Sequence, residues 1–304
     1  MPARNKNKNI FSKLFVIGVL VFAFVFLYIV LTVYTSNSVW ENNSKFSMAI
    51  PLESGDALVL VLDPATQSLI KLTIPKNTAV EAARQLGSWK MGSIYTLDQH
   101  ENQNGQLFKD TITKSFNFPI DGWGEEKALA LVSQNPLTSF KGLLGNYNSD
   151  LSIKDKLKLI AYSLTKSNIK KVDLNLEDTS NLIKSTLADG ESGFVPKKQL
   201  SPQVLSYFTD SEIAEKSPRI QIVNYSNTNR ISEEVAQTIK VLGGNVLSIL
   251  NRSENRDFKC EITGLDKLMI KKIAQVYNCN LSQKSTQNNF DVMIELGSEF
   301  AKVY

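Results

Sequence analysis

Apolar positions along this chain fall into two kinds of pattern. The run from Leu14 to Tyr34 contains no charged residue. At a rise of about 1.5 Å per residue, a helix of this length crosses a hydrocarbon core about 30 Å thick. Beyond Tyr34, short apolar segments recur between turn-forming residues, which is typical of folded domains. The pattern therefore predicts one transmembrane helix, 14–34, followed by folded regions.

Charges beside the apolar run predict its orientation. Residues 1–13 contain Arg4, Lys6, Lys8 and Lys13 and no acidic residue. Segments rich in Lys and Arg stay on the cytoplasmic side of a membrane. We therefore expect a cytoplasmic basic tail and a single-pass protein of the cell membrane whose carboxy-terminal bulk is extracytoplasmic.

A cleaved secretory signal is the alternative interpretation of this run. Signal peptides have a shorter apolar core and a small-x-small cleavage site directly after it. Here the core is longer, and the sequence from Thr35 to Ser44 offers no clean site of that kind. We therefore expect an uncleaved anchor. The Ser- and Asn-containing residues 35–50 are then expected to act as a tether.

The first folded region, 51–190, opens with two predicted strands. Ala57–Leu62 is an uninterrupted apolar run, which indicates a strand covered on both faces. Residues 70–74 then alternate apolar and polar as in a half-buried strand, which Pro75 ends. Because only a short polar link joins the two runs, we expect an antiparallel pair.

The rest of this region mixes helical and strand patterns. Apolar residues at helical spacing predict a helix over 107–116, and Ser152 begins another whose Asp155 completes a capped start. We expect a strand over 172–176, a short helix over 179–187 and a loop over 135–150. The expected fold class is therefore mixed α/β or α+β.

Glycine and proline residues separate this region from a second one. Residues 191–218 contain Gly193, Pro196 and Pro202 and are expected to form a linker. Residues 219–304 then show a clean alternation of strand and helix patterns. The expected order is strand 219–225, helix 231–242, strand 246–250, strand 258–262, helix 265–276 and strand 291–296. This βαββαβ order is that of a ferredoxin-like sandwich.

Charge and composition exclude several classes of function. The formal net charge is +4, which the four basic residues before the apolar run account for. The exterior portion is therefore near neutral, and we expect no nucleic-acid partner, since such a partner requires a basic face. The chain has one histidine, His100, and two cysteines, too few for a metal site of converging ligands. We expect no metal and no cofactor.

The two cysteines are a candidate disulfide. Cys260 falls in the predicted strand before the second helix of 219–304, and Cys279 just after that helix. In an oxidising compartment two cysteines usually pair, and a bond closing a loop of this size stabilises a fold by about 3 kcal/mol. Two buried free thiols are the alternative.

Two motifs bracket the second folded region. Residues 220–227 read Ile-Gln-Ile-Val-Asn-Tyr-Ser-Asn, and residues 291–297 read Asp-Val-Met-Ile-Glu-Leu-Gly. With the intervening helix that ends at Gly243-Gly244, this region resembles the LytR carboxy-terminal domain. The resemblance covers Arg219 to Ala301.

The first region carries a more divergent set of motifs. A strand ends at Asp63, a hairpin leads to Ile74-Pro75-Lys76-Asn77, and the stretch from Lys90 to Tyr95 follows. The set resembles the LytR-CpsA-Psr domain, which has Ile-Pro-Arg-Asp at the hairpin. The resemblance implies transfer of a glycopolymer from a polyprenyl-pyrophosphate carrier to peptidoglycan, with a divalent metal and several arginines on the pyrophosphate.

The chain departs from that motif at the residues that matter for catalysis. Lys76 replaces the arginine and Asn77 replaces the aspartate, and Arg84 is the only arginine between Thr35 and Pro218. A guanidinium offers a pyrophosphate paired donors that an ammonium lacks, and an amide is a poorer ligand for magnesium than a carboxylate. These replacements lead us to expect no transferase activity.

Two functional hypotheses follow. The first is a membrane-anchored, non-catalytic protein of the cell envelope that contacts the bilayer through 14–34 and binds peptidoglycan, another envelope glycan or envelope proteins. The alternative is a divergent glycopolymer-to-peptidoglycan phosphotransferase that uses magnesium and a site drawn from Asp63, Lys76, Asn77 and Lys90, with Asp121. A DNA-binding regulator is not expected, because a near-neutral portion beyond a membrane has no access to DNA and no recognition helix with basic side chains.

Overall fold

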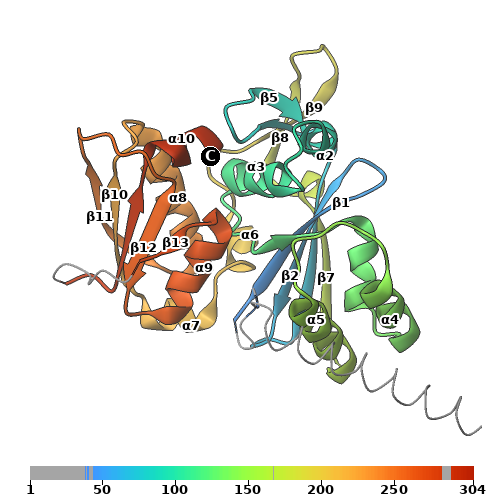
Figure 1. Cartoon of the computed structure of the whole chain (residues 1–304). Coiled ribbons are helices and arrows are strands. Elements are labelled where there is room, and N and C mark those ends of the chain that lie inside the picture. The colour runs from blue at the N-terminus through green and yellow to red at the C-terminus, as the bar shows by residue number, and fades with distance from the viewer. Residues whose placement is uncertain (1–37, 39, 41–43, 167, 283–288) are drawn as a thin grey trace, which may run out of the picture.

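The computed structural model of the chain describes residues 38, 40, 44–166, 168–282 and 289–304 (Figure 1). Within these ranges no helix combines the length and apolar character needed to cross a bilayer. The predicted transmembrane run, 14–34, and the basic tail, 1–13, lie outside the described residues. The last five residues of the expected tether, 46–50, belong to the first strand of the fold, Phe46–Pro51.

The first folded region is built on a five-stranded mixed sheet with the order β6-β1-β2-β3-β7. The central strands β1, β2 and β3 are antiparallel, while β6 pairs with β1 and β7 with β3 in parallel. The predicted antiparallel pair is thus confirmed. The strands are β1 (Phe46–Pro51), β2 (Ala57–Asp63), β3 (Ser68–Ile74), β6 (Gly122–Trp123) and β7 (Lys170–Asn175).

Helices cover both faces of this sheet, as the uninterrupted apolar run of β2 predicts. Val59 and Val61 pack in one core with α2 (Met91–His100) and α3 (Gln106–Phe116). Leu58, Leu60 and Leu62 face the opposite core, beneath η1 (Glu126–Val132) and α5 (Ile153–Thr165). Figure 1 shows α4 (Pro136–Leu144) beside α5 on that second face. The mixed α/β class is confirmed.

Two local predictions in this region are wrong. The stretch 135–150, expected to be a loop because of its glycines, contains α4, whose first turn Asn135 caps by accepting bonds from the amides of Leu137 and Thr138. The stretch 179–187, expected to be helical, contains β8 (Leu182–Thr186), which pairs with β9 (Ser192–Pro196). Strand pairing with a later segment outweighs the local pattern there. The capped start at Ser152 is confirmed, since its side chain accepts from the amide of Asp155.

Short elements complete the first region and lead to the second. They are β4 (Ala79–Glu81), β5 (Ser88–Lys90), η2 (Leu176–Asp178), α6 (Pro202–Ser206) and α7 (Ser211–Lys216). The expected linker, 191–218, therefore contains a strand and two short helices. The amide of Phe194 in β9 donates to the carbonyl oxygen of Asn77 at 3.0 Å, so this hairpin contacts the end of β3.

The second region contains the six predicted elements in the predicted order, with two further short elements in its described part, β13 (Asn280–Leu281) and α10 (Ser298–Val303), and its sheet differs from the expected one. Its order is β11-β10-β14-β12-β13, with β10 parallel to both β11 and β14. A ferredoxin-like sheet is antiparallel, so that expectation is wrong; the crossover through α8 returns β11 beside β10 in the same direction. The elements are β10 (Arg219–Asn224), α8 (Asn229–Leu242), β11 (Asn245–Asn251), β12 (Cys260–Gly264), α9 (Lys267–Tyr277), β13 (Asn280–Leu281), β14 (Val292–Leu296) and α10 (Ser298–Val303).

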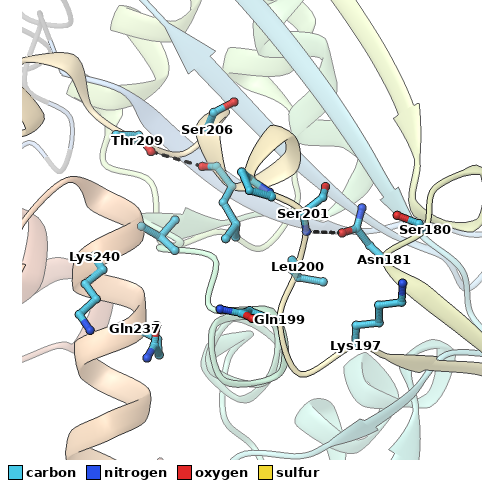
Figure 2. A pocket seen from close by; sticks show the side chains of 13 residues that line it. Ser180, Asn181, Lys197, Gln199, Leu200, Ser201, Ser206, Thr209, Gln237 and Lys240 are labelled. Carbon is cyan, nitrogen blue, oxygen red and sulfur yellow. Dashed lines mark hydrogen bonds between the residues drawn. The ribbon is translucent and has the colours of Figure 1, made fainter.

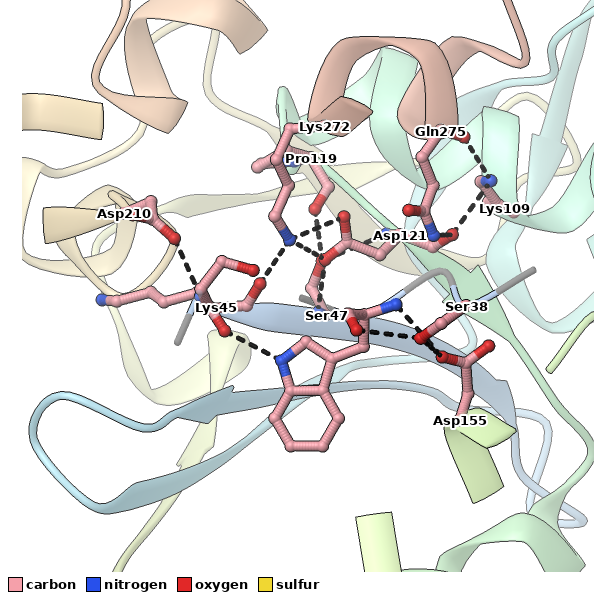
Figure 3. Close-up of polar contacts among 12 residues, drawn as sticks. Ser38, Lys45, Ser47, Lys109, Pro119, Asp121, Asp155, Asp210, Lys272 and Gln275 are labelled. Atoms are coloured by element: carbon pink, nitrogen blue, oxygen red, sulfur yellow. Dashed lines mark hydrogen bonds and ion pairs between the residues drawn. The ribbon is translucent and has the colours of Figure 1, made fainter. Parts of the chain in front are cut away.

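A buried polar cluster joins the two regions (Figure 3). Lys272 of α9 places its Nζ 2.8 Å from Oδ2 of Asp121, and their side chains are only 4% and 3% exposed. Gln275, one turn later, donates from Nε2 to the carbonyl oxygen of Asp121 at 2.7 Å. The Nζ of Lys109 donates to the carbonyl oxygen of Gln275 at 3.0 Å. We call these four residues the interdomain lock, because they fix α9 against the first region.

A second buried carboxyl group on α3 makes stability depend on pH. Burial raises the pKa of Asp110 to about 6, although the charges of Lys109, Lys259 and Arg84 and a hydrogen bond from Gln106 act in the opposite direction. The folded state therefore binds a proton more tightly than the unfolded state does. The contribution of Asp110 is most favourable below about pH 4 and is lost as the pH rises through about 6.

Replacing this carboxyl group by an amide is expected to raise stability at neutral pH. In Asp110→Asn the free energy of unfolding should rise by on the order of 3 kcal/mol at pH 7, since one pKa unit corresponds to about 1.4 kcal/mol. Urea unfolding of the detergent-solubilised chain between pH 4 and pH 7 measures the effect. The exposed Asp173→Asn serves as the control. Parallel pH profiles for wild type and Asp110→Asn would contradict the assignment.

Candidate functional site

Three residues of the predicted transferase site, Lys76, Asn77 and Lys90, lie at the open end of the β2–β3 hairpin, where β2 begins and β3 ends. In the register of this pair, Ala57 opposes Ile74 and Asp63 opposes Ser68. The residues before β2 and after β3 therefore meet, and the amide of Lys76 donates to Oδ1 of Asp56 at 2.8 Å. We call this cluster the hairpin-end site.

Asp63 does not belong to this site. It closes the other end of β2, seven residue steps and about 24 Å along the strand from Asp56, which contacts the backbone of Lys76. There its Oδ2 lies 3.1 Å from the Nζ of Lys45, and its Oδ1 accepts the amide of Ala65 at 3.0 Å. Burial acts to raise the pKa of Asp63, but the charge and hydrogen bond of Lys45 and the bonds from Thr66 hold it below its ordinary value. Asp63 stabilises a turn.

Asp121 is also separate from the hairpin-end site. Its carboxylate is held by Lys272 in the interdomain lock, and Oδ2 accepts the amide of Ser47 at 2.9 Å. Neither side chain of this pair is available to a ligand, because both are buried.

Lys90 and Asn77 lie at the hairpin-end site and are engaged by the β8–β9 hairpin. The Nζ of Lys90 pairs with Asp189 and donates to Oε2 of Glu191 at 2.5 Å, and the bond to Asp189 is the largest cause of a raised pKa of Lys90. Asn77 donates from Nδ2 to the carbonyl oxygen of Ser192 at 3.4 Å. The backbone of Gly92 donates to the carbonyl oxygen of Lys76 at 3.0 Å, which brings these residues together.

The charge balance of this cluster is unsuited to a pyrophosphate. The cluster contains two lysines, Lys76 and Lys90, and three carboxylates: Asp56, bonded to the backbone amide of Lys76, and Asp189 and Glu191, paired with the Nζ of Lys90. Arg84 lies elsewhere, where its charge acts on Asp110 and Lys259 at the junction of the two regions. A leaving group with several negative charges requires net positive charge around it. Among the described residues, no group of three or more His, Cys, Asp or Glu side chains is arranged to hold a metal ion.

The core beneath the hairpin-end site is filled by side chains. Leu72 and Ile74 of β3 pack with Ile94 of α2 and with Ile112 and Phe116 of α3, and each is 0% exposed. A tunnel wide enough for a lipid chain would leave exposed surface on the side chains that line it. These residues therefore pack as an ordinary core.

Sequence reasoning missed three residues of this cluster. The contact of Asp56 could have been predicted from the sequence, because an antiparallel hairpin places the residue before its first strand beside the residue after its second strand. Asp189 and Glu191 come from a turn that lies 99 and 101 positions beyond Lys90 in the sequence. No local pattern indicates that contact.

A polar groove between the two regions is the other candidate site (Figure 2). Its first pocket, about 650 Å³, lies between the segment 197–209 and helix α8. Lys197 and Lys240 stand on its two walls, and the lining includes no carboxylate and no aromatic ring. The remaining polar lining consists of hydroxyl and amide side chains: Ser180, Asn181, Gln199, Ser201, Ser206, Thr209 and Gln237.

The wall of this pocket is held in place by Asn181. Its side chain is 2% exposed, and its Oδ1 accepts the amide of Ser201 at 2.6 Å while Nδ2 donates to Thr179 at 2.9 Å. The amide of Lys197 donates to the carbonyl oxygen of Asn181 at 3.0 Å. Asn181 thus positions both Lys197 and the start of α6.

A second pocket, about 880 Å³, extends this groove along α8 and shares Lys197 and Gln237 with the first. Together we call the two pockets the interdomain groove. Arg230 in the second pocket is held by Glu234, 2.7 Å from its Nε, and lies 3.7 Å from Glu81. Within the described part of the chain, four groove lysines make no ion pair: Lys114, Lys197, Lys198 and Lys240.

The charge of the interdomain groove is positive. Five basic side chains and three acidic ones line it, which leaves two positive charges. Ammonium groups beside hydroxyls and amides suit a ligand that carries both phosphate or carboxylate groups and hydroxyls. The absence of aromatic rings from the lining of both pockets makes stacking on a neutral sugar face unavailable there.

No protein-family model and no curated protein sequence matches the chain. Among solved structures, Bacillus subtilis TagT is 13% identical over 53% of this chain and 87% of its own, with a TM-score of 0.37. B. subtilis TagV is 11% identical over 51% of this chain and 92% of its own, with a TM-score of 0.37.

A further structure similar to this chain is the LytR-CPS2A-psr family protein YwtF (TagT) with bound octaprenyl pyrophosphate lipid. It is 13% identical over 53% of this chain and 87% of its own, with a TM-score of 0.36. The name of this neighbour is that of the family which the motifs of the first region resemble. At these identities and scores we draw nothing further from the neighbours.

Proposed function

We propose that this chain is a membrane-anchored, extracytoplasmic protein of the cell envelope that binds an anionic cell-wall glycan in the interdomain groove and performs no transfer reaction. The observation that carries the proposal is the groove itself, where four lysines that form no ion pair with any described residue lie among hydroxyl and amide side chains. An anionic glycan presents the matching groups, since phosphates or carboxylates meet ammonium groups and its hydroxyls meet amides.

The hairpin-end site supports the non-catalytic part of the proposal. The ammonium group of Lys90 is engaged by Asp189 and Glu191, and the carboxylate of Asp56 accepts the backbone amide of Lys76. No described arginine contributes its charge to this cluster, since Arg84 acts on Asp110 and Lys259. The described side chains below it, Leu72, Ile74, Ile94, Ile112 and Phe116, pack against one another as a filled core.

Reversing two groove charges is expected to weaken binding to the wall. In Lys197→Glu with Lys240→Glu, affinity for isolated cell wall should fall about tenfold or more, because two favourable charge interactions become repulsive. Co-sedimentation of the detergent-solubilised chain with isolated wall measures the affinity. The matched control is Lys267→Glu with Lys302→Glu, which changes the net charge equally on exposed residues outside the groove.

Three outcomes of this experiment bear on the proposal. Binding that is lost in the groove variant, kept in the control variant and abolished by chemical removal of phosphodiester-linked polymer from the wall supports it. Equal losses in the two variants would mean that only net charge matters. Release of polyprenyl pyrophosphate from a lipid-linked glycan, dependent on magnesium and on Lys76, would instead establish the phosphotransferase alternative.

A further inference from the structure

Helix α4 carries large apolar side chains on its outer face. Leu137 is 76%, Phe140 59% and Leu144 79% exposed. Their spacing of three and four residues places them on one side of the helix. We call these three residues the α4 stripe. Such a contiguous exposed apolar surface marks a site of interaction.

Close packing of the inner face of α4 against η1 fixes which face of the helix is exposed. Gly142 faces η1 so closely that a Cβ there would lie 2.8 Å from the Cβ of Ala130. Ser139 is fully buried and donates from Oγ to the carbonyl oxygen of Ser133 at 2.8 Å. Because only small side chains fit against η1, a rotation of α4 cannot bury the α4 stripe.

The residues just after the predicted transmembrane run are attached to helix α5. Ser38 donates from Oγ to Oδ1 of Asp155 on α5 at 2.7 Å, and the amide of Trp40 donates to the same oxygen at 3.1 Å. Trp40 is 3% exposed and packs against Tyr162 of α5. The chain is therefore fixed to α5 almost directly after the apolar run.

Chain length then places α5 and α4 at the bilayer surface. Only four residue steps separate Tyr34 from Ser38, which span at most about 14 Å. A bilayer crossed by residues 14–34 thus begins close to α5. Since α4 lies beside α5 (Figure 1), the exposed face of α4 has lipid within reach.

Charges around the α4 stripe suit the same surroundings. Lys141 on α4 and Lys127 on η1 are exposed, and apolar residues flanked by basic ones are typical of segments that lie in the interface of a membrane with anionic lipids.

We propose that the α4 stripe inserts into the outer surface of the bilayer, so that the folded part lies on the membrane at two points, its anchor and α4. This inference rests on the proposed membrane anchoring. It names the lipid bilayer as the partner of α4. It also fixes the orientation of the folded part relative to the membrane, which a single flexible tether would leave free.

Photocrosslinking of the full chain in vesicles tests the proposal. The photoreactive residue p-benzoylphenylalanine replaces Phe140 in one variant and Leu265, 80% exposed in the second region, in the matched control. The vesicles contain phosphatidylcholine with a minority of phosphatidylglycerol. The expected result is about tenfold more lipid adduct at 140 than at 265, because a residue seated among acyl chains is surrounded by C–H bonds and an exposed residue by water.

Each other outcome overturns the inference in a distinguishable way. Insertion of the chain with equally low adduct at 140 and 265 leaves the anchor in place and removes α4 from the bilayer. An adduct at 140 with the mass of two chains makes α4 a contact between copies. Failure of both variants to remain with the vesicles after a carbonate wash removes the anchoring on which the inference rests.

Discussion

In the variant Lys272→Met the free energy of unfolding is expected to fall by about 3–5 kcal/mol, because removing one partner of a buried ion pair leaves the other charge without compensation. The carboxylate of Asp121, whose side chain is 3% exposed, would keep the amide of Ser47 as a donor but would lose its ion pair with Lys272. Urea unfolding of the detergent-solubilised chain, followed by circular dichroism, measures the loss.

Two further variants test whether the loss of stability comes from the broken ion pair or from replacing any lysine of α9. Lys267→Met removes an exposed lysine from the first turn of the same helix and should change stability by less than about 0.5 kcal/mol. Adding Asp121→Asn to Lys272→Met removes the uncompensated charge, so the double variant should recover part of the loss. A Lys272→Met protein as stable as the Lys267→Met protein would show that the interdomain lock contributes nothing.

Removal of the disulfide is expected to have the next largest effect on stability. The structure contains a bond between Cys260 in β12 and Cys279 just after α9, at a separation of 19 residues. Replacing both cysteines by alanine should lower the free energy of unfolding by about 3 kcal/mol, since the unfolded chain regains the entropy of an open loop. The closed loop contains α9, and with it Lys272 and Gln275 of the interdomain lock.

Reduction of the wild-type protein provides the control for this prediction. Thermal unfolding with and without a reducing agent should show the reduced wild type shifting to the midpoint of the alanine variant, while the variant itself does not respond to the reducing agent. If oxidised wild type and the alanine variant unfold at the same temperature, the bond does not stabilise the second region.

Local sequence patterns predicted the elements whose burial pattern or capping residue is encoded within a few neighbouring positions. The continuous apolar run of β2 and the alternation of β3 specified two strands, because each pattern states how many faces of a strand are buried. The short polar link between them specified the antiparallel pairing. The capping residue Ser152 and the amphipathic pattern after it specified α5 in the same way. The position of the two cysteines on either side of α9 likewise placed a candidate bond that the structure contains.

Local sequence patterns could not predict contacts between segments that are far apart in the chain. Lys272 and Asp121 are 151 positions apart, and each looks like an ordinary charged residue in its own segment. The interdomain groove depends on how α8 lies against the segment 197–209, which no periodicity encodes. Assignment of Asp63 to the transferase site also failed for this reason, since the register of the hairpin, and not the motif alone, decides which end of β2 meets Lys76.

Backbone hydrogen–deuterium exchange of the full chain, with and without a phosphate-bearing wall glycan, distinguishes the two candidate sites within one experiment. We expect slower exchange on glycan addition in the segment 197–209 and in α8 around Gln237 and Lys240, which line the interdomain groove, and no change around Lys76 and Lys90. Protection confined to the residues around Lys76 and Lys90, with the groove unchanged, would contradict binding in the groove and return the hairpin-end site to consideration as the place where substrate is held.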